Sequence, residues 1–243
     1  MGLDRTEFAR ALGVVPDPWQ EQLLRSDATR VLLNCSRQSG KSTMSALVAL
    51  HRALYSPDSL ILCLAPALRQ SQELFAKIAG FYRELGRPVS PVAEQRLGLE
   101  LTNGSRIVTL PGSEKTIRGF SGVDLLILDE AARVSDELYY AIRPMLAVSG
   151  GSLMMMSTPF GKRGVFFEEW ENGTGWERYT VTAEEVPRIS PEILEEERMS
   201  LGEWWFLQEY MCRFMDTVDQ VFASEVVERA VTDEVKPLFI GGR

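Results

Sequence analysis

Histidine and cysteine are scarce in this sequence of 243 residues, and their scarcity limits the chemistry available to it. His51 is the only histidine, so sites that need a histidine pair, including His-rich zinc sites and most His-assisted nucleophiles, are nearly excluded. The three cysteines are odd in number and lack the close spacings that bind metals: Cys35, Cys63 and Cys212. We expect them to be buried free thiols in a reducing compartment.

Long apolar runs are also missing. No stretch reaches 18 consecutive apolar residues, and the N-terminus "MGLDRTEFARALG" is charged throughout. Neither a membrane span nor a signal peptide is expected, and the predicted location is the cytoplasm. The net charge of −8 argues against a protein whose whole surface coats nucleic acid, because such binding depends on many lysine and arginine contacts to phosphates. A local basic strip is still compatible with this charge.

Apolar runs alternate with helical patterns along the chain. Continuous apolar runs, typical of strands buried on both faces, occur in residues 31–34, 60–65, 123–130 and 151–159. Residues 41–55 are rich in Ala, Leu and Met, and residues 68–85 carry apolar residues near helical spacing. Two alternating runs flank Asn103-Gly104, which predicts a β-hairpin. The order predicts an α/β fold with a mostly parallel sheet covered by helices on both faces.

The two ends of the chain have a different character. Residues 4–26 look helical and then turn at "PDPWQEQLLRS". Residues 190–214 are strongly charged and predict two short helices split at Gly202, which would form a small C-terminal helical lid. We expect an N-terminal segment and core in residues 1–183, the lid in residues 184–220 and a linker in residues 221–243.

The stretch "VLLNCSRQSGKST", residues 31–43, predicts a strand that runs into a phosphate-binding turn and a helix. Backbone N–H groups of such a turn attract anions, Gly40 permits close approach, Lys41 reaches the outer phosphates and the Ser42 hydroxyl ligates Mg²⁺. The glycine usually found five residues before Gly40 is absent, because Cys35 stands there. A bare Gly-Lys-Ser arises by chance in roughly one chain in ten of this length, so it is a weak indication alone. The predicted nucleotide-binding residues of this loop are Ser36, Arg37, Gln38, Ser39, Gly40, Lys41, Ser42 and Thr43.

The run "LLILDE" strengthens the prediction of a nucleotide site. A phosphate-bound Mg²⁺ needs a carboxylate at the C-terminal end of a neighbouring strand, and four apolar residues leading into Asp129 provide one. Glu130 would then polarise the attacking water. The alternative is that Asp129 and Glu130 are the N-cap pair of a helix starting in "EAARVSDEL".

Three further residues are candidates for the same edge of the sheet. Ser157 and Thr158 follow the apolar run "LMMM" and would sense the γ-phosphate; a simple strand-ending turn is the alternative. The Gln20 amide would read both the donor and the acceptor of the adenine edge, and a solvated helical glutamine is its alternative.

Taken together, these residues resemble the ATPase domain of the terminase large subunit of tailed phages or prophages, a DNA-packaging motor. The resemblance covers residues 16–222 and lies in the combination of "PWQ", "SRQSGKST", "LTNGSRIVTLPG", "IRGFSG", "LLILDE" and "MMMSTPFGKRG". It implies a RecA-like P-loop NTPase of the additional-strand type with a C-terminal lid. The implied activity is ATP hydrolysis with Mg²⁺, driving translocation of double-stranded viral DNA into a procapsid.

The same resemblance implies roles for further residues and partners. Arg37 matches an arginine near the γ-phosphate of its own site, Arg118 in "TIRG" matches an arginine offered to a neighbouring subunit, and Ser157-Thr158-Pro159 matches the motif that couples hydrolysis to movement. The implied partners are double-stranded DNA, a portal protein and a small terminase subunit. A homo-oligomeric ring is expected on assembly, with a monomer left open in isolation, in the bacterial host cytoplasm and transiently docked on the procapsid.

Family members usually continue into an RNase H-like nuclease, and this sequence stops at Arg243. We therefore expect residues 221–243 to be a linker toward an absent nuclease domain and expect no DNA cleavage from this chain.

Two other functions stay open at this point. A superfamily 2 helicase fragment would share the loop and Asp129-Glu130 but needs a second RecA-like domain, for which about 110 residues after Glu130 are too few. A nucleotide-dependent DNA clamp with little turnover would need neither Glu130 nor the arginines. The weak candidates for DNA contact, each of which is also readily explained as a surface charge, are Lys115, Arg133, Lys162 and Arg163.

Overall fold

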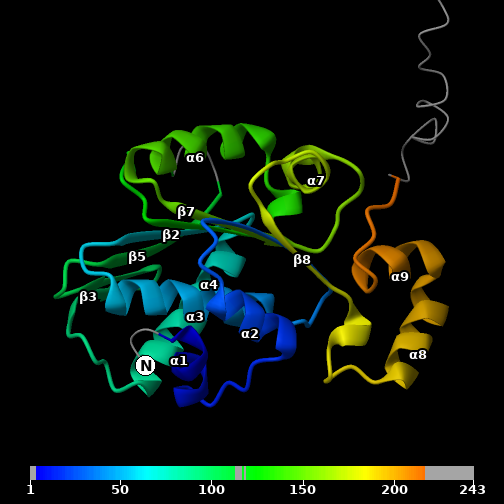
Figure 1. Ribbon diagram of the computed structural model, residues 1–243, viewed down its shortest axis with the longest axis horizontal. Coiled ribbons are helices and arrows are strands. Elements are labelled where there is room, and N and C mark those ends of the chain that lie inside the picture. The colour runs from blue at the N-terminus through cyan, green and yellow to red at the C-terminus, as the bar shows by residue number, and fades with distance from the viewer. Residues whose placement is uncertain (1–3, 113–116, 118, 217–243) are drawn as a thin grey trace, which may run out of the picture.

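The computed structural model describes residues 4–112, 117 and 119–216, and it shows a central sheet between two layers of helices (Figure 1). The strands of this part are β1 (Arg30–Cys35), β2 (Leu60–Ala65), β3 (Pro91–Gln95), β4 (Gly98–Leu101), β5 (Arg106–Pro111), β6 (Leu125–Asp129), β7 (Ser152–Ser157) and β8 (Glu177–Val181). Its α-helices are α1 (Arg5–Ala11), α2 (Pro18–Arg25), α3 (Lys41–Tyr55), α4 (Leu68–Glu84), α6 (Asp136–Ser149), α7 (Gly164–Glu171), α8 (Pro191–Leu201) and α9 (Glu203–Glu209).

The central strands are buried on both faces because their side chains alternate between two hydrophobic layers. In β1, Val31 and Leu33 pack with α1, α2, α3 and α4, whereas Leu32 packs with α6 and α7. The same alternation holds in β2, where Ile61 faces the first layer and Leu62 the second. In Figure 1, α6 and α7 lie above the sheet and α1 to α4 below it. The predicted sheet with helices on both faces is confirmed.

The strand order is β3-β4-β5-β2-β6-β7-β1-β8, and the six strands from β5 to β8 in this order run parallel. β7 lies between β1, which leads into the phosphate loop, and β6, which carries Asp129. An extra strand inserted at this place defines the additional-strand type, so that prediction is also confirmed.

The hairpin predicted around Asn103-Gly104 is present, since β4 and β5 pair antiparallel. β5 also pairs parallel with β2, so the hairpin extends the main sheet. Two edge strands, β3 and β8, have no counterpart among the apolar runs. Their residues are partly exposed, and an edge strand with one wet side lacks the continuous apolar run that marks a central strand.

The sequence interpretation of residues 16–26 as a turn is wrong, because Pro18–Arg25 form helix α2. Pro18 occupies the first turn, and Asp17 and Gln20 form a capping box, in which the Gln20 side chain accepts from the Asp17 backbone N–H. This start signal outweighs the turn tendency of "PDP".

A small helical appendage (residues 183–212) follows β8. Its helices α8 and α9 meet at Gly202, as predicted, and its own cluster contains Ala183, Leu194 and Phe206. In Figure 1 the appendage lies beside the sheet, beyond β8. That it acts as a lid stays a prediction.

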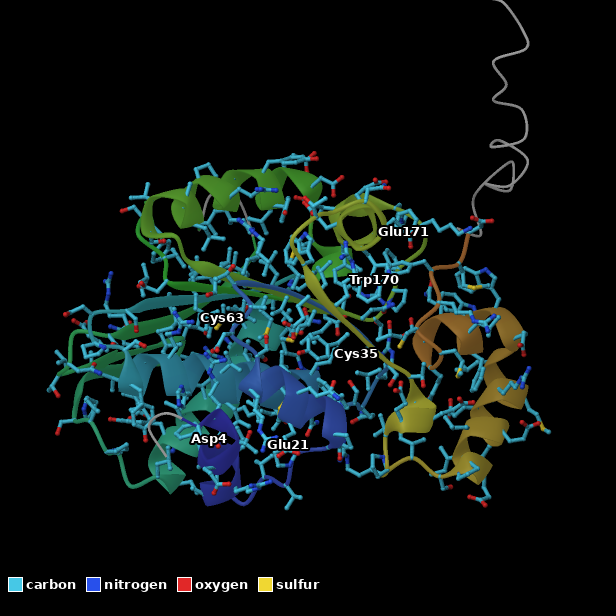
Figure 2. All side chains as sticks on the ribbon, in the orientation of Figure 1. Asp4, Glu21, Cys35, Cys63, Trp170 and Glu171 are labelled. Atoms are coloured by element: carbon cyan, nitrogen blue, oxygen red, sulfur yellow. The ribbon has the colours of Figure 1, made fainter. Side chains whose placement is uncertain are left out.

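The three cysteines are buried free thiols, as expected. Figure 2 labels Cys35 and Cys63 in the interior of the molecule. Burial raises the pKa of the Cys35 thiol to about 12, so it is protonated at neutral pH. Within the described residues, we find no helix with the length and hydrophobicity needed to cross a membrane.

Candidate functional site

The phosphate loop connects β1 to α3, and its conformation requires glycine at position 40. Gly40 has φ +98° and caps α3, whose Thr43 and Met44 N–H groups donate to its carbonyl at 3.0 and 3.1 Å. A Cβ at this position would lie 2.7 Å from Gln20 Nε2. A residue with a side chain would therefore not fit at position 40.

Lys41 is buried beneath the loop and holds it together. Its Nζ donates to the carbonyls of Cys35 at 3.3 Å and Ser36 at 3.1 Å. Ser39 Oγ donates to the same Ser36 carbonyl at 2.9 Å. In the described part of the chain, the hydrogen-bond partners of Lys41 Nζ are therefore neutral carbonyls only.

The unusual Cys35 is the last residue of strand β1, and its side chain is part of the core. Besides Gly40, Gln38 supplies a left-handed residue of the loop, with φ +60°. Ser36 Oγ is buried and lacks a hydrogen-bond partner within the described residues. This orphaned hydroxyl is consistent with a loop that receives a polar ligand.

Asp129 and Glu130 lie at the end of β6, as predicted. Asp129 Oδ1 accepts from Glu130 N–H at 3.0 Å, and the Asp129 side chain is almost fully buried. Burial, with a smaller contribution from the neighbouring Glu130, raises the pKa of the Asp129 carboxyl to about 6, while the charge of Lys41 opposes this shift. Lys41 and Asp129 are thus close enough to interact electrostatically.

The alternative in which this pair caps a helix holds only in part, because Glu130 is the N-cap residue of the 3₁₀ helix Ala131–Arg133 but makes no side-chain cap hydrogen bond there. The pair does not cap α6. Helix α6 begins at Asp136, and Ser135 caps it by accepting from Leu138 N–H at 3.3 Å. Glu130 itself has φ +51°, an uncommon conformation for a residue with a side chain. Such strain is often found at functional sites.

Ser157 and Thr158 are both buried where β7 ends. Ser157 Oγ donates to Glu130 Oε2 at 3.4 Å, and Ser157 is the parallel partner of Asn34 on β1. The first residue of the predicted coupling motif therefore contacts the candidate catalytic carboxylate.

Gln20 is buried against the loop, which excludes the solvated glutamine considered as its alternative. Its Nε2 donates to the Ser39 carbonyl at 3.2 Å. Arg188, from the start of the appendage, donates to the same carbonyl at 3.3 Å and forms an ion pair with Asp17 at 2.9 Å. Helix α2, the loop and the appendage therefore meet at Ser39.

The Arg37 side chain contacts the appendage, and its charge also interacts with that of Glu130. Its Nε donates to Glu209 Oε2 at 2.5 Å, and the side-chain hydrogen bond raises the pKa of the guanidinium further. Arg133 lies 3.8 Å from the other oxygen of Glu209 and 3.9 Å from Glu130 Oε2. Glu209 thus contacts two arginines, Arg37 from the phosphate loop and Arg133 from the 3₁₀ helix Ala131–Arg133.

The remaining candidates are placed as follows. Arg133 lies 4.2 Å from the ring centre of Phe160, Arg163 lies 4.6 Å from the same ring, and Lys162 forms an ion pair with Asp216 at 3.1 Å. Ser42 and Thr43 lie in the first turn of α3. Lys115 and Arg118 lie outside the described residues.

Sequence reasoning missed Arg188, Glu209 and Lys77. Lys77 donates to Thr43 Oγ1 at 3.2 Å, and its charge also acts on Asp129. All three are single charges on helices or loops distant in sequence, and no local pattern marks them. Only the Asp17 capping box, an Asp three residues before a Gln and followed by Pro, carried a signal that the sequence interpretation overlooked.

The fold and the loop define a P-loop protein of the RecA-like, additional-strand class. The sequence model of the family described as "Terminase large subunit, T4likevirus-type, N-terminal" matches residues 32–229, so the chain belongs to this family. The resemblance inferred from the motifs is confirmed.

Known proteins agree with this assignment. The terminase large subunit of Thermus phage G20c is 27% identical over 254 residues, which cover 90% of this chain and 52% of the phage protein. The chain therefore spans about half the length of that relative. The solved large terminase ATPase domain of Thermus phage P74-26 has a TM-score of 0.75 and 26% identity, covering 86% of this chain and 98% of that domain. The large terminase of a thermophilic bacteriophage, solved in complex with ATP-gamma-S, shares the fold at a TM-score of 0.63 and 14% identity, covering 87% of this chain and 53% of that one.

The raised pKa of Asp129 predicts a pH-dependent stability of the metal-free chain. The shift from 3.8 to about 6 corresponds to about 3 kcal/mol of unfolding free energy. Because the pKa is higher in the folded state, the protonated carboxyl favours folding below about pH 4, and this contribution is lost as the pH rises through 6. Asp129→Asn should be more stable than the wild type by up to about 3 kcal/mol at pH 7.5 and by about 1 kcal/mol at pH 4.5.

Urea unfolding with a chelator present measures both differences. The amide oxygen of the variant still accepts from Glu130 N–H, so the comparison isolates the charge. A stability difference that is the same at both pH values would contradict the assigned pKa.

Proposed function

We propose that this chain binds ATP and Mg²⁺ where the loops after β1, β6 and β7 meet, and that it hydrolyses ATP to translocate double-stranded viral DNA into a procapsid. One observation carries the proposal: Lys41 and the Asp129-Glu130 pair lie at the C-terminal ends of the parallel strands. Lys41 follows β1, Asp129 ends β6, and β7 lies between these two strands. Membership of the terminase family and the fold shared with a solved large terminase ATPase domain support it.

The groups at this edge fit ATP and Mg²⁺. Lys41 offers a buried cation, and the orphaned Ser36 hydroxyl offers a polar group to the phosphates. The proposed metal ligands are the Ser42 hydroxyl and the Asp129 carboxylate, oxygen donors of the kind that Mg²⁺ prefers. A bound Mg²⁺ would neutralise phosphate charge and would also favour the ionised form of Asp129.

Glu130 is the proposed residue that orients and polarises the attacking water. The Ser157 hydrogen bond at 3.4 Å supports this role, because it ties the carboxylate to the end of the neighbouring strand. Arg37 is proposed to act on the γ-phosphate of its own site, and Arg118 on that of a neighbouring subunit. Ser157 and Thr158 would then couple the state of the phosphate to movement.

The proposed contact to adenine is the Gln20 amide. Its Oε1 accepts from Asp17 N–H and its Nε2 donates to the Ser39 carbonyl. A glutamine amide has two N–H groups and two acceptor lone pairs, so one of each is still available for the base. The loop-binding role and the base-reading role are therefore compatible.

The proposal also includes the assembly of this chain with other proteins and with copies of itself. A portal protein and a small terminase subunit are the proposed partners, the appendage is the proposed lid, and a ring of this chain is the proposed working form. Lys162 and Arg163 are proposed to contact DNA, together with Arg133 and Lys115. The ion pair of Lys162 with Asp216 and the packing of Arg133 on Phe160 mean that such contact would have to compete with contacts inside the protein.

Removal of the lysine tests the nucleotide site. Lys41→Ala should weaken ATP binding at least about 100-fold, because buried cation–phosphate contacts are worth several kcal/mol. Calorimetric titration measures the affinity, and circular dichroism verifies the fold. Arg69→Ala is the matched control, since Arg69 is exposed and forms an ion pair with Glu73 of its own helix, α4. Wild-type affinity in a folded Lys41→Ala protein would place the site elsewhere.

Glu130→Gln separates binding from turnover. The amide keeps the shape but loses the charge that polarises water, so ATP binding should persist while hydrolysis falls by about 10²-fold to 10⁴-fold. Phosphate release and ATP titration measure the two quantities. If binding and turnover fell together, Glu130 would be a ligand or a structural residue instead.

Duplex DNA distinguishes a packaging motor from the other two functions. The ATPase rate should rise when duplex DNA and a portal are added, and the DNA effect should decline with salt because phosphate contacts are screened. Strand separation by this chain alone would favour a helicase. Tight nucleotide binding with negligible turnover under all conditions would favour a clamp.

A further inference from the structure

A cavity of about 320 Å³, which we call the amino-end pocket, lies at the amino ends of the central strands. Its lining includes Leu125, the first residue of β6, Ser152, the first residue of β7, and Val31 near the start of β1. The proposed nucleotide site lies at the opposite, carboxyl ends of these strands. Since a strand of five or six residues is roughly 15–20 Å long, the pocket is separate from that site.

Two arginines from different helices line the amino-end pocket. Arg5 is the first residue of α1, and Arg52 lies in the last turn of α3. Burial, followed by the charge of Arg52, lowers the pKa of the Arg5 guanidinium, and the charge of Asp27 opposes this shift. The two cations therefore lie close enough to repel each other, and both are half-buried. Two partly desolvated like charges are unfavourable together unless an anion accompanies them.

The described residues supply only part of this countercharge. Asp27 is the one acidic residue in the described lining, and it is exposed to water. The Arg5 side chain donates to the Ser26 carbonyl at 3.0 Å, and the Arg52 side chain donates to Ser152 Oγ at 3.5 Å. These are the only side-chain hydrogen bonds of the two arginines within the described residues. Because a guanidinium carries five N–H donors, most of the donors are available to a ligand.

The rest of the lining is mostly apolar. Leu23 of α2, Val48 of α3 and Met154 of β7 contribute buried side chains, and Ser26 and Thr29 add hydroxyl groups. A cavity with apolar walls and a few polar groups is typical of small-molecule sites, whose volumes are about 300–1,000 Å³. The amino-end pocket therefore suits a small ligand with both an anionic group and an apolar part.

We propose that the amino-end pocket binds a small organic anion. Its carboxylate or phosphate group accepts hydrogen bonds from Arg5 and Arg52, whose flat guanidinium groups match two oxygens at once. Its apolar part packs against Leu23 and Val48. The site is independent of the nucleotide, because none of the proposed nucleotide-binding residues belongs to its described lining.

Titration calorimetry of the full chain with hexanoate tests this proposal. Hexanoate should bind with a dissociation constant in the millimolar range or below. Hexanol lacks the charge and acetate lacks the apolar body, so each should bind at least about tenfold more weakly. Hexyl phosphate distinguishes the two anionic groups: tighter binding than that of hexanoate assigns the pocket to phosphate esters, and weaker binding assigns it to carboxylates.

Four variants test the lining. Arg5→Gln and Arg52→Gln remove a charge but keep an N–H donor, and each should weaken hexanoate binding about tenfold. Asp27→Asn removes a repelling carboxylate and should strengthen binding up to about fivefold, a modest gain because Asp27 is exposed. Arg25→Gln is the matched control, since Arg25 is an exposed arginine of α2 that pairs with Glu21 and lies outside the described lining. It should bind hexanoate as the wild type does, and circular dichroism verifies the fold of each variant.

Several results would overturn the proposal. It fails if hexanoate does not bind, if hexanol binds equally well, or if neither arginine substitution weakens binding. Displacement of hexanoate by duplex DNA would place the arginines on a nucleic-acid surface instead. Loss of hexanoate binding in a folded Lys41→Ala protein would place the ligand in the nucleotide site. Failure of hexanoate to bind would leave the proposed function intact, because ATP binding depends on different residues.

Discussion

The common end point of three parallel strands is the constraint on which the site depends. In the register of β1, β7 and β6, Asn34 pairs with Ser157 and Asp129 pairs with Met156, so β1 and β6 each end within one residue of the end of β7. Each strand is buried on both faces, and a shift of one residue would move every side chain into the wrong layer. The hydrophobic core therefore sets the spacing between the phosphate loop, the Asp129-Glu130 pair and Ser157.

This dependence explains how much of the site could be predicted from the sequence. Residues at the ends of apolar strands, such as Asp129 and Ser157, are predictable because continuous burial marks the strand and parallel pairing brings the ends together. Glu209 is different, because it meets Arg37 across 172 positions of the chain and its helix has no motif. Edge strand β8 was missed for a related reason, since half-exposed residues give no continuous apolar run.

The absent glycine of the phosphate loop has a structural explanation. Position 35 is the last residue of β1, where a buried cysteine fills the core under the loop. The left-handed backbone that the turn needs is supplied by Gln38 and Gly40. At Gly40 the amide of Gln20 approaches so closely that a side chain would collide with it. This loop therefore needs glycine at position 40 but not at position 35.

The charged groups around the loop destabilise the ligand-free chain and would interact favourably with a bound ligand. Asp129 is buried beside Glu130, and Lys41 only partly offsets the resulting rise in its pKa. Lys41 donates to neutral carbonyls, and Glu130 has a strained backbone. Each of these features costs stability in the free chain. A ligand that carries both phosphate charge and a divalent cation would offset the two that involve charge, at Asp129 and Lys41. The site is thus preorganised for such a ligand, because the packing of the hydrophobic core, rather than its charged groups, fixes its geometry.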